Sequence, residues 1–247
     1  MFIVKGIKDF LYKIKQDIIS LRRYPEVNLS EVVKVDYDKY WSKKRDGKKA
    51  VLSSWQKQRA DYVLRMIERE SSILDLGCGD GAVLKYLKEK GGINGIGVDI
   101  SDEILKKAAE IGVKTIKIDI SKLENLEKLP EVDYILGFEI IEHMPNTEEF
   151  IFKIQKKAKK GIIFSFPNTG YYTHRLRLLF GRFPLQWIQN PGEHLRFWTV
   201  KDLRWWVSSM GFNLDKLVIY EGLPFLNKIF PSFFGQGIIV KLVYKKD

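Results

Sequence analysis

The chain has 247 residues, of which 45% are hydrophobic, so it is long and apolar enough for one α/β domain with additions. Its 42 basic and 31 acidic residues give a net charge of +11, which indicates either anionic partners or simply a lysine-rich surface. One cysteine, Cys78, excludes a disulfide framework, and with no signal peptide evident and no apolar run of roughly 18 residues we expect a cytoplasmic protein.

Residues 2–23 have the spacing of an amphipathic helix, with Ile7, Leu11, Ile14 and Ile18 on one face and the lysines off it. Such a helix can lie on an anionic membrane surface, which would make the protein peripheral at the membrane. It can equally pack on its own domain or on a second subunit, and the pattern does not separate these cases.

From residue 54 onward, predicted helices alternate with predicted strands. The helices cover residues 54–70, 82–90, 102–110, 122–128 and 147–158, and the strands cover 73–76, 94–99, 113–118, 133–138 and 161–166. Alternation of this kind predicts a mostly parallel sheet with helices on both faces. Ser101 and Asn146 are the predicted N-caps of two of the helices.

After Pro167 the alternation stops, and residues 168–197 are rich in aromatics and arginines. A long excursion at the carboxyl end of a strand is where α/β enzymes place ligand contacts. A helix over 199–211 and two strands over 217–220 and 238–244, antiparallel to each other, close the chain. The apolar connection 223–234 predicts a homodimer face, a membrane-facing patch, a hydrophobic substrate channel or packing against residues 2–23.

The glycine-rich stretch at 72–81 carries the main functional signal. Its glycines end a buried strand and precede a helix, so the backbone can turn sharply and approach a ligand. The next strand ends in Asp99, 22 positions after Gly77, where an acidic residue binds ribose hydroxyls. Asp75 and Asp80 would repel a pyrophosphate but suit an ammonium group. S-adenosylmethionine, which has an ammonium, a ribose diol and an adenine, therefore fits this loop.

These motifs resemble those of the class I S-adenosylmethionine-dependent methyltransferases, with matches at residues 74–81, 97–100, 118–120 and 133–136. The resemblance covers about residues 40–245 and implies a Rossmann-like seven-stranded α/β fold with an antiparallel C-terminal strand. It implies that Asp99 binds the ribose, Asp119 the adenine amine and the glycine loop the methionine part. The full set of expected cofactor contacts is Asp75, Gly77, Cys78, Gly79, Asp80, Gly81, Asp99, Ile100, Asp119, Ile120 and Glu139.

The aromatic segment 37–41 resembles the cofactor-covering lid of small-molecule methyltransferases, with ordinary packing as the alternative. We therefore divide the chain into residues 1–50, which contain the amphipathic helix and the lid, and residues 51–247, the methyltransferase domain. That domain carries the expected substrate-side insertion at about 168–197.

Glu139, Glu142 and His143 follow the fourth strand at positions i, i+3 and i+4, which share one face on a helical turn. Two carboxylates and an imidazole can hold a divalent ion. The carboxylates favour Mg²⁺ or Mn²⁺, and the imidazole favours Mn, Fe, Co or Zn. Alternatively, His143 or His194 is a metal-free general base, or Glu142 and His143 have only a structural role.

This set, with a later His194 before the helix start at Thr199, resembles two methyltransferase groups. They are the ubiquinone-biosynthesis (UbiG-like) O-methyltransferases and the small-RNA 3′-end 2′-O-methyltransferases. The resemblance implies that Glu139, Glu142, His143 and His194 hold a metal that binds two neighbouring hydroxyls, and that Glu142, His143 and His194 are catalytic. We prefer O-methylation of a small molecule, and nucleic acid is the less favoured partner.

Residues 163–168 and 175–184 resemble the MetW-like group, which is linked to methionine biosynthesis. Those proteins act with a homoserine acyltransferase and need not be methyltransferases, so the alternative is a binding or regulatory partner without turnover. The chain departs from that group where it carries Glu139, Glu142 and His143, and this departure favours an enzyme.

Overall fold

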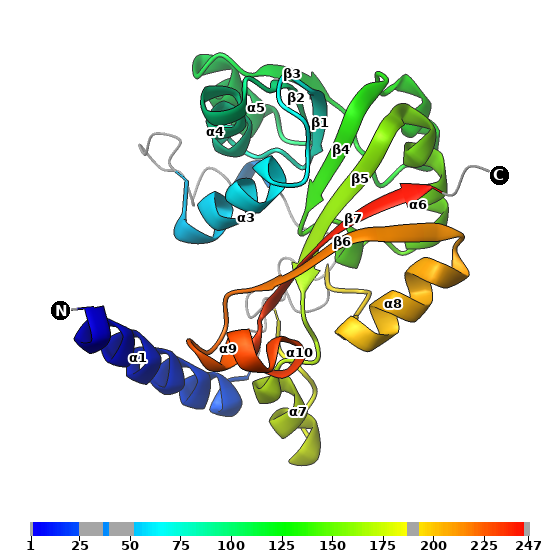
Figure 1. Cartoon of the computed structure of the whole chain (residues 1–247). Coiled ribbons are helices and arrows are strands. Elements are labelled where there is room, and N and C mark those ends of the chain that lie inside the picture. The colour runs from blue at the N-terminus through cyan, green and yellow to red at the C-terminus, as the bar shows by residue number, and fades with distance from the viewer. Residues whose placement is uncertain (1, 25–36, 40–51, 187–192, 245–247) are drawn as a thin grey trace.

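A seven-stranded sheet with the strand order β3-β2-β1-β4-β5-β7-β6 forms the centre of the computed structural model (Figure 1). Residues 2–24, 37–39, 52–186 and 193–244 are described. The second half of the expected lid, the boundary at residues 50–51 and part of the expected insertion lie outside the described residues, so the domain division stays a prediction. The strands are β1 Ser72–Leu76, β2 Asn94–Asp99, β3 Lys114–Lys117, β4 Val132–Phe138, β5 Ala158–Pro167, β6 Phe212–Tyr220 and β7 Gly237–Tyr244.

The first five strands pair in parallel, and β7 runs antiparallel to both β5 and β6. This arrangement confirms the predicted fold, including the antiparallel C-terminal strand. The central strands β1 and β4 are apolar runs because both of their faces are covered. Leu74 and Leu76 point into one hydrophobic cluster and Ile73 into the other, as the alternation of side chains along a strand requires.

Helices cover both faces of the sheet (Figure 1). One cluster lies under α3 Ser54–Leu64, α4 Ala82–Gly91 and α5 Asp102–Glu110. The other lies under α6 Thr147–Ile154, α8 Val200–Ser209 and the short 3-10 helix η1 Leu123–Lys128. Both faces of the sheet are thus covered, and in such α/β sheets ligands bind at the carboxyl edge of the strands.

The helix ends differ in places from the sequence prediction, and the helix expected over 54–70 ends already at Leu64. The helix expected over 147–158 ends at Ile154, because one 3-10 turn, η3 Gln155–Lys157, leads into β5 at Ala158. Ser101 caps α5 as expected, since its side chain accepts from the N–H of Ile104 at 3.3 Å. Asn146 precedes α6 as expected but makes no side-chain capping bond, while the neighbouring Thr147 Oγ1 donates to the carbonyls of Ile141 and Met144, at 3.1 and 2.8 Å.

The remaining helices gather at one end of the molecule, below the sheet in Figure 1. They are α1 Phe2–Arg22, α7 Tyr172–Leu179, α9 Leu226–Ile229 and α10 Pro231–Phe234. The helix predicted over residues 2–23 is confirmed, but its expected apolar face is only partly packed, with Leu11 58% and Ile18 51% exposed. Across the described ranges, no helix is both long and apolar enough to cross a bilayer.

Candidate active site

A cavity of about 820 Å³ lies at the carboxyl ends of β1, β2 and β4. Its wall contains every expected cofactor residue except Asp80 and Gly81. Asp80 is buried behind the loop, where its Oδ1 accepts from the N–H of Ala82 at 3.2 Å at the start of α4. Gly81 is the residue that precedes α4, so these two positions shape the loop rather than the cavity wall.

The glycine loop, residues 77–81, adopts backbone conformations that are rare for residues with a side chain. Gly77, Gly79 and Gly81 have φ angles of 69°, 55° and 72°, in the left-handed region. A Cβ at Gly77 would lie only 2.4 Å from Cδ1 of Ile140. The loop is fastened to β2, because the N–H groups of Gly77 and Cys78 donate to the carbonyl of Val98 at 2.7 and 3.0 Å.

Asp99 joins the loop to the second strand. Its carboxylate accepts from the N–H of Gly79 at 3.1 Å and from the N–H of Ser101 at 3.1 Å. Burial raises the pKa of Asp99, and the backbone donors of Ser101 and Gly79 oppose the rise. The side chain is thus held in one orientation in the cavity wall, with acceptor capacity left on both oxygens.

Asp75 and Cys78 form the floor of the cavity beneath the loop. Burial, and secondarily the charge of Asp99, raises the pKa of Asp75 to about 7. Burial also raises the pKa of the Cys78 thiol, and its Sγ would lie 2.5 Å from a Cβ at Gly97. Cys78 therefore fills space against β2 as an un-ionised thiol, which does not suit a nucleophile.

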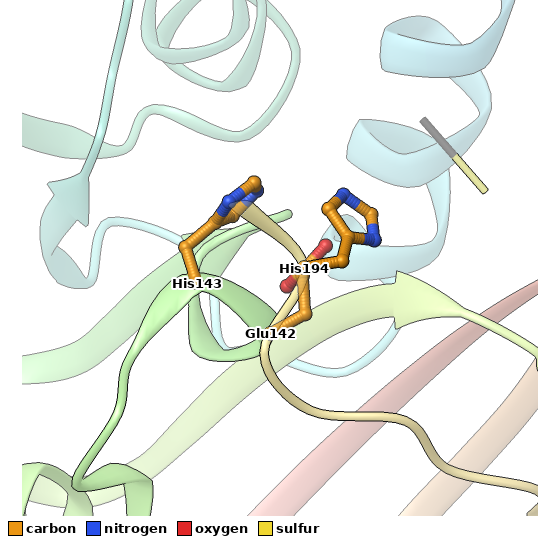
Figure 2. Close-up of side chains that lie close together, drawn as sticks. All are labelled: Glu142, His143 and His194. Carbon is orange, nitrogen blue, oxygen red and sulfur yellow. The ribbon is translucent and has the colours of Figure 1, made fainter. Parts of the chain in front are cut away.

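Glu142, His143 and His194 form a cluster next to this cavity (Figure 2). One ligand atom from each lies within 4.8 Å of the others. Glu142 and His143 belong to the 3-10 turn η2 Ile141–His143, which follows β4. His194 reaches them because the N–H groups of Leu195 and Arg196 donate to the carbonyl of Glu142, at 2.7 and 3.1 Å.

Both histidines present Nε2 as the nitrogen that carries the lone pair. Nδ1 of His143 lies 3.1 Å from the carbonyl of Glu193, which can only accept, so Nδ1 carries the proton. Nδ1 of His194 lies 3.2 Å from Oε1 of Gln186, whose amide is oriented by a bond to Thr169 Oγ1 at 2.9 Å. Burial lowers the pKa of each imidazole to about 4, so both rings are neutral at pH 7.

Glu142 is the most deeply buried member of the cluster. Its side chain is 1% exposed, and neither oxygen has a hydrogen-bond partner within the described ranges. Burial, then the nearby Glu139 carboxylate, raises the pKa of Glu142 well above its ordinary value of 4.5. One carboxylate and two neutral imidazoles are a donor set that fits a divalent transition metal.

Glu139 is not one of the three clustered residues, although its carboxylate lies near enough to raise the pKa of Glu142. It has a φ of 56°, in the left-handed region, so the chain leaves helical geometry between Glu139 and η2. Its Oε1 accepts from Arg59 at 3.0 Å and from Ser165 Oγ at 3.1 Å, on the side of α3. Glu139 thus lines the cavity beside the cluster without sharing a regular helical turn with it, and its role as a metal ligand stays a prediction.

Sequence reasoning missed Arg59, which is buried, lines the cavity and lies over the ring of Phe138. Its position three and four residues before Tyr62 and Val63, on the apolar side of α3, was the available signal. The described part of the expected lid also reaches the cavity. Tyr37 donates to Oε2 of Glu193 at 3.2 Å, and Asp38 accepts from the hydroxyl of Ser101.

A second cavity of about 400 Å³ adjoins the first. His194 and Gln186 line both cavities, so the cluster stands between them. The other walls of the second cavity are aromatic and basic, with Tyr24, Phe183 and Phe197 beside Arg177 and Arg182. Its position suits the group that reacts with a ligand held in the first cavity.

The strand order and the glycine-loop cavity define a class I S-adenosylmethionine-dependent methyltransferase fold. Within this class the chain belongs to the MetW family, because the sequence profile described as "Methionine biosynthesis protein MetW" matches residues 57–240. The profile spans the described part of the domain from α3 to β7, including the loop and the cluster.

Similar proteins extend this assignment. Ubiquinone biosynthesis O-methyltransferase from Rickettsia bellii is 26% identical over 206 residues, which are 77% of this chain and 84% of that protein. The bifunctional methionine biosynthesis protein MetXA/MetW from Rhodopirellula baltica is 26% identical over 177 residues, 65% of this chain and 28% of that protein. Both resemblances expected from the motifs, UbiG-like and MetW-like, are thus confirmed at the level of homology.

Solved structures share the fold. A SAM-dependent methyltransferase from Archaeoglobus fulgidus has a TM-score of 0.56 and 20% identity, covering 84% of this chain and 99% of that one. Magnesium protoporphyrin IX methyltransferase from Synechocystis, solved with bound SAH, has a TM-score of 0.56 and 16% identity, covering 97% of this chain and 98% of that one. At such low identity these structures define the fold and leave the methyl acceptor open.

Proposed function

We propose that this protein transfers the methyl group of S-adenosylmethionine to an oxygen of a small molecule with two neighbouring hydroxyls, aided by a divalent cation. The observation that carries the proposal is the cluster of Glu142, His143 and His194 between the two cavities. A buried carboxylate without a hydrogen-bond partner in the described ranges is costly unless a cation or a proton compensates it.

The first cavity suits the methyl donor, part by part. Asp99 is fixed by two backbone donors and would accept from the ribose hydroxyls. Asp119 would bind the adenine amine at the end of β3, where Ser121 N–H holds its Oδ1 at 3.1 Å. The glycine loop would take the methionine part, and Asp75, at the carboxyl half of β1, would face the ammonium group. A cationic group there would lower the raised pKa of Asp75.

The second cavity would place the acceptor hydroxyl next to the sulfonium methyl group. The acceptor oxygen attacks the methyl carbon, the carbon–sulfur bond breaks, and the electron pair stays on sulfur to give S-adenosylhomocysteine. Glu142, His143 and His194 would hold a divalent cation, which would lower the pKa of the acceptor hydroxyl so that its proton is lost to solvent. Without a cation, Nε2 of either histidine is the group that would take the proton.

The test separates cofactor binding from turnover. Calorimetry should show S-adenosylmethionine binding to the wild-type protein and to His194→Ala, and a loss of binding in Asp99→Asn. Methyl transfer to catechols, with Mn²⁺ restored after chelation, should be lost in His194→Ala. Glu149→Gln, which removes an exposed carboxylate on α6, should keep full activity. Cofactor binding without transfer to any catechol, diol or sugar would reject the reaction and keep the fold assignment.

Family membership favours a second candidate, a partner that binds S-adenosylmethionine without turnover. In Rhodopirellula baltica the matching region is part of a bifunctional MetXA/MetW protein. We infer that a non-catalytic chain would co-purify with a homoserine acyltransferase and return bound S-adenosylmethionine unconsumed. A chain that copurifies in this way and also methylates a catechol would exclude the purely regulatory role.

A further inference from the structure

Helix α1 packs with a side that mixes apolar and charged residues. Among the side chains of α1 described from Gly6 onward, Asp17 is the buried one, 4% exposed, and it accepts from the hydroxyls of Tyr171 and Tyr172, both at 2.7 Å. Lys13 pairs with Asp17 at 3.0 Å and donates to Gln236 at 2.9 Å. The side of α1 that faces the domain therefore combines this ion pair and its hydrogen bonds with the half-buried Phe10, Ile14 and Leu21.

The outer side of α1 carries large apolar residues instead. Ile7, Leu11 and Ile18 lie within one narrow stripe of the helix and are 51%, 58% and 51% exposed. Lys8 and Lys15 are exposed on the flank of this stripe. Tyr12, Ile19 and Arg22 are exposed on the same half of the helix. Apolar and basic side chains are thus interleaved on a face of α1 that the rest of the domain does not cover.

Neighbouring elements at the same end of the molecule also expose apolar side chains. Leu179 and Phe180 at the end of α7 are 76% and 74% exposed, and Ile229 and Phe230 around α9 are 65% and 60% exposed. Most of the exposed large hydrophobic side chains of the described residues lie at this end of the molecule, where α1, α7, α9 and α10 gather (Figure 1). The set exceeds the scattered apolar residues that are normal on a monomer surface.

The helix cannot turn to bury its outer side. Arg177 donates to the carbonyls of Ser20, Leu21 and Arg23, at 3.0 to 3.1 Å. Arg182 donates to the carbonyl of Leu21 at 2.6 Å. Cationic side chains at the carboxyl end of a helix also complement its dipole. The orientation of α1 is therefore fixed at its end as well as at Asp17.

We propose that the outer side of α1, with the tips of α7 and α9, docks on a bilayer surface that contains anionic lipids. Interleaved basic and apolar residues are typical of helices that lie in the plane of the membrane interface. Helix α1 is about 30 Å long and is not apolar enough to span the bilayer, so it would lie along the surface. A second copy would bring Lys8 and Lys15 against like charges in a chain of net charge +11, which disfavours a homodimer through this face.

Flotation of the full-length protein with vesicles tests the proposal. We expect binding to phosphatidylcholine vesicles that contain phosphatidylglycerol, and weak binding to phosphatidylcholine alone. Lys8→Glu with Lys15→Glu should lower the partition constant at least about 25-fold, since each lysine near an anionic surface contributes about fivefold. Leu11→Ser with Ile18→Ser should lower it several-fold. Lys85→Glu with Lys88→Glu, the same charge change on α4, should leave it near wild type.

Cofactor binding and melting temperature, measured on each variant, show that the domain stays folded. The proposal is overturned if the wild-type protein does not bind the anionic vesicles, or if the α4 control weakens binding as much as the α1 variant. It is also overturned if the protein is a dimer in solution that Leu11→Ser with Ile18→Ser dissociates, because the face would then belong to a second copy.

Discussion

Replacing Glu142 by Gln tests the cation site through stability alone, without knowledge of the substrate. Glutamine keeps the shape of the side chain and removes a carboxyl group that is 1% exposed and whose pKa is raised, so that the folded wild type must either hold a proton on it or bury a charge. An unsatisfied buried group costs about 1–3 kcal/mol, and more when charged. In a chelator, Glu142→Gln should therefore raise the free energy of unfolding by about 2 kcal/mol, or the melting temperature by about 5 °C.

With Mn²⁺ present, the wild type should become more stable than Glu142→Gln. A cation whose concentration is about 100 times its dissociation constant raises the free energy of unfolding of the protein that binds it by about 2.7 kcal/mol. Glu142→Gln would not show this increase. Scanning fluorimetry in EDTA and in excess Mn²⁺ measures both effects on one sample. Glu149→Gln, which also loses one carboxylate but on the exposed side of α6, should follow the wild type within about 0.5 kcal/mol in both conditions.

The reasoning is refuted if Glu142→Gln melts below the wild type in EDTA, since the carboxylate would then be stabilising without a cation. It is refuted equally if Mn²⁺ shifts the two proteins by the same amount, because the ion would then bind elsewhere. In either case Glu142 would have a structural role in η2.

Three further changes test other parts of the molecule. The pKa of Asp75 is raised from 3.8 to about 7, so the folded state binds more protons than the unfolded state in that window and stability falls as pH rises through it. Asp75→Asn should remove that slope in urea titrations, gaining up to about 4 kcal/mol above pH 7, and an unchanged slope would contradict the assigned pKa. Asp17→Ala leaves two tyrosine hydroxyls without an acceptor and should cost about 3 kcal/mol, seen as faster amide exchange in α1 but not in the sheet. Asp9→Ala on the same helix, at an exposed position, is the control, and equal exchange in both would show that Asp17 does not hold α1. Tyr37→Phe removes the bond to Glu193 and should weaken S-adenosylmethionine binding about fivefold without changing the melting temperature, whereas unchanged affinity would reject the lid.

The fold could be predicted because its signals are local. Strands alternate with helices, and Gly77 and Asp99 stand at the ends of consecutive strands that parallel pairing brings to one edge. The cavity wall could be anticipated for the same reason. The end of α6 was missed because Lys156 and Lys157 continue a helical pattern, while pairing of β5 with β4 begins at Ala158 and overrides it.

The cluster was only partly predictable. Spacing at i, i+3 and i+4 assumes one continuous helical turn, and the left-handed backbone at Glu139 breaks that assumption. Arg59, 80 residues away, then takes the carboxylate of Glu139. In the same way, the periodicity of α1 indicated an amphipathic helix, but the tyrosines that hold Asp17 lie 154 and 155 residues further along. No local pattern in the sequence identifies such partners.

The two amide hydrogens that reach the Glu142 carbonyl have a consequence for how this protein can vary. Position 195 contributes a peptide N–H at 2.7 Å, while its own leucine side chain is 48% exposed. Any amino acid except proline supplies that hydrogen. Homologues could therefore carry different side chains at position 195 and still hold a histidine at position 194 in the same place. A proline at 195 would remove the hydrogen bond to Glu142 and release that segment.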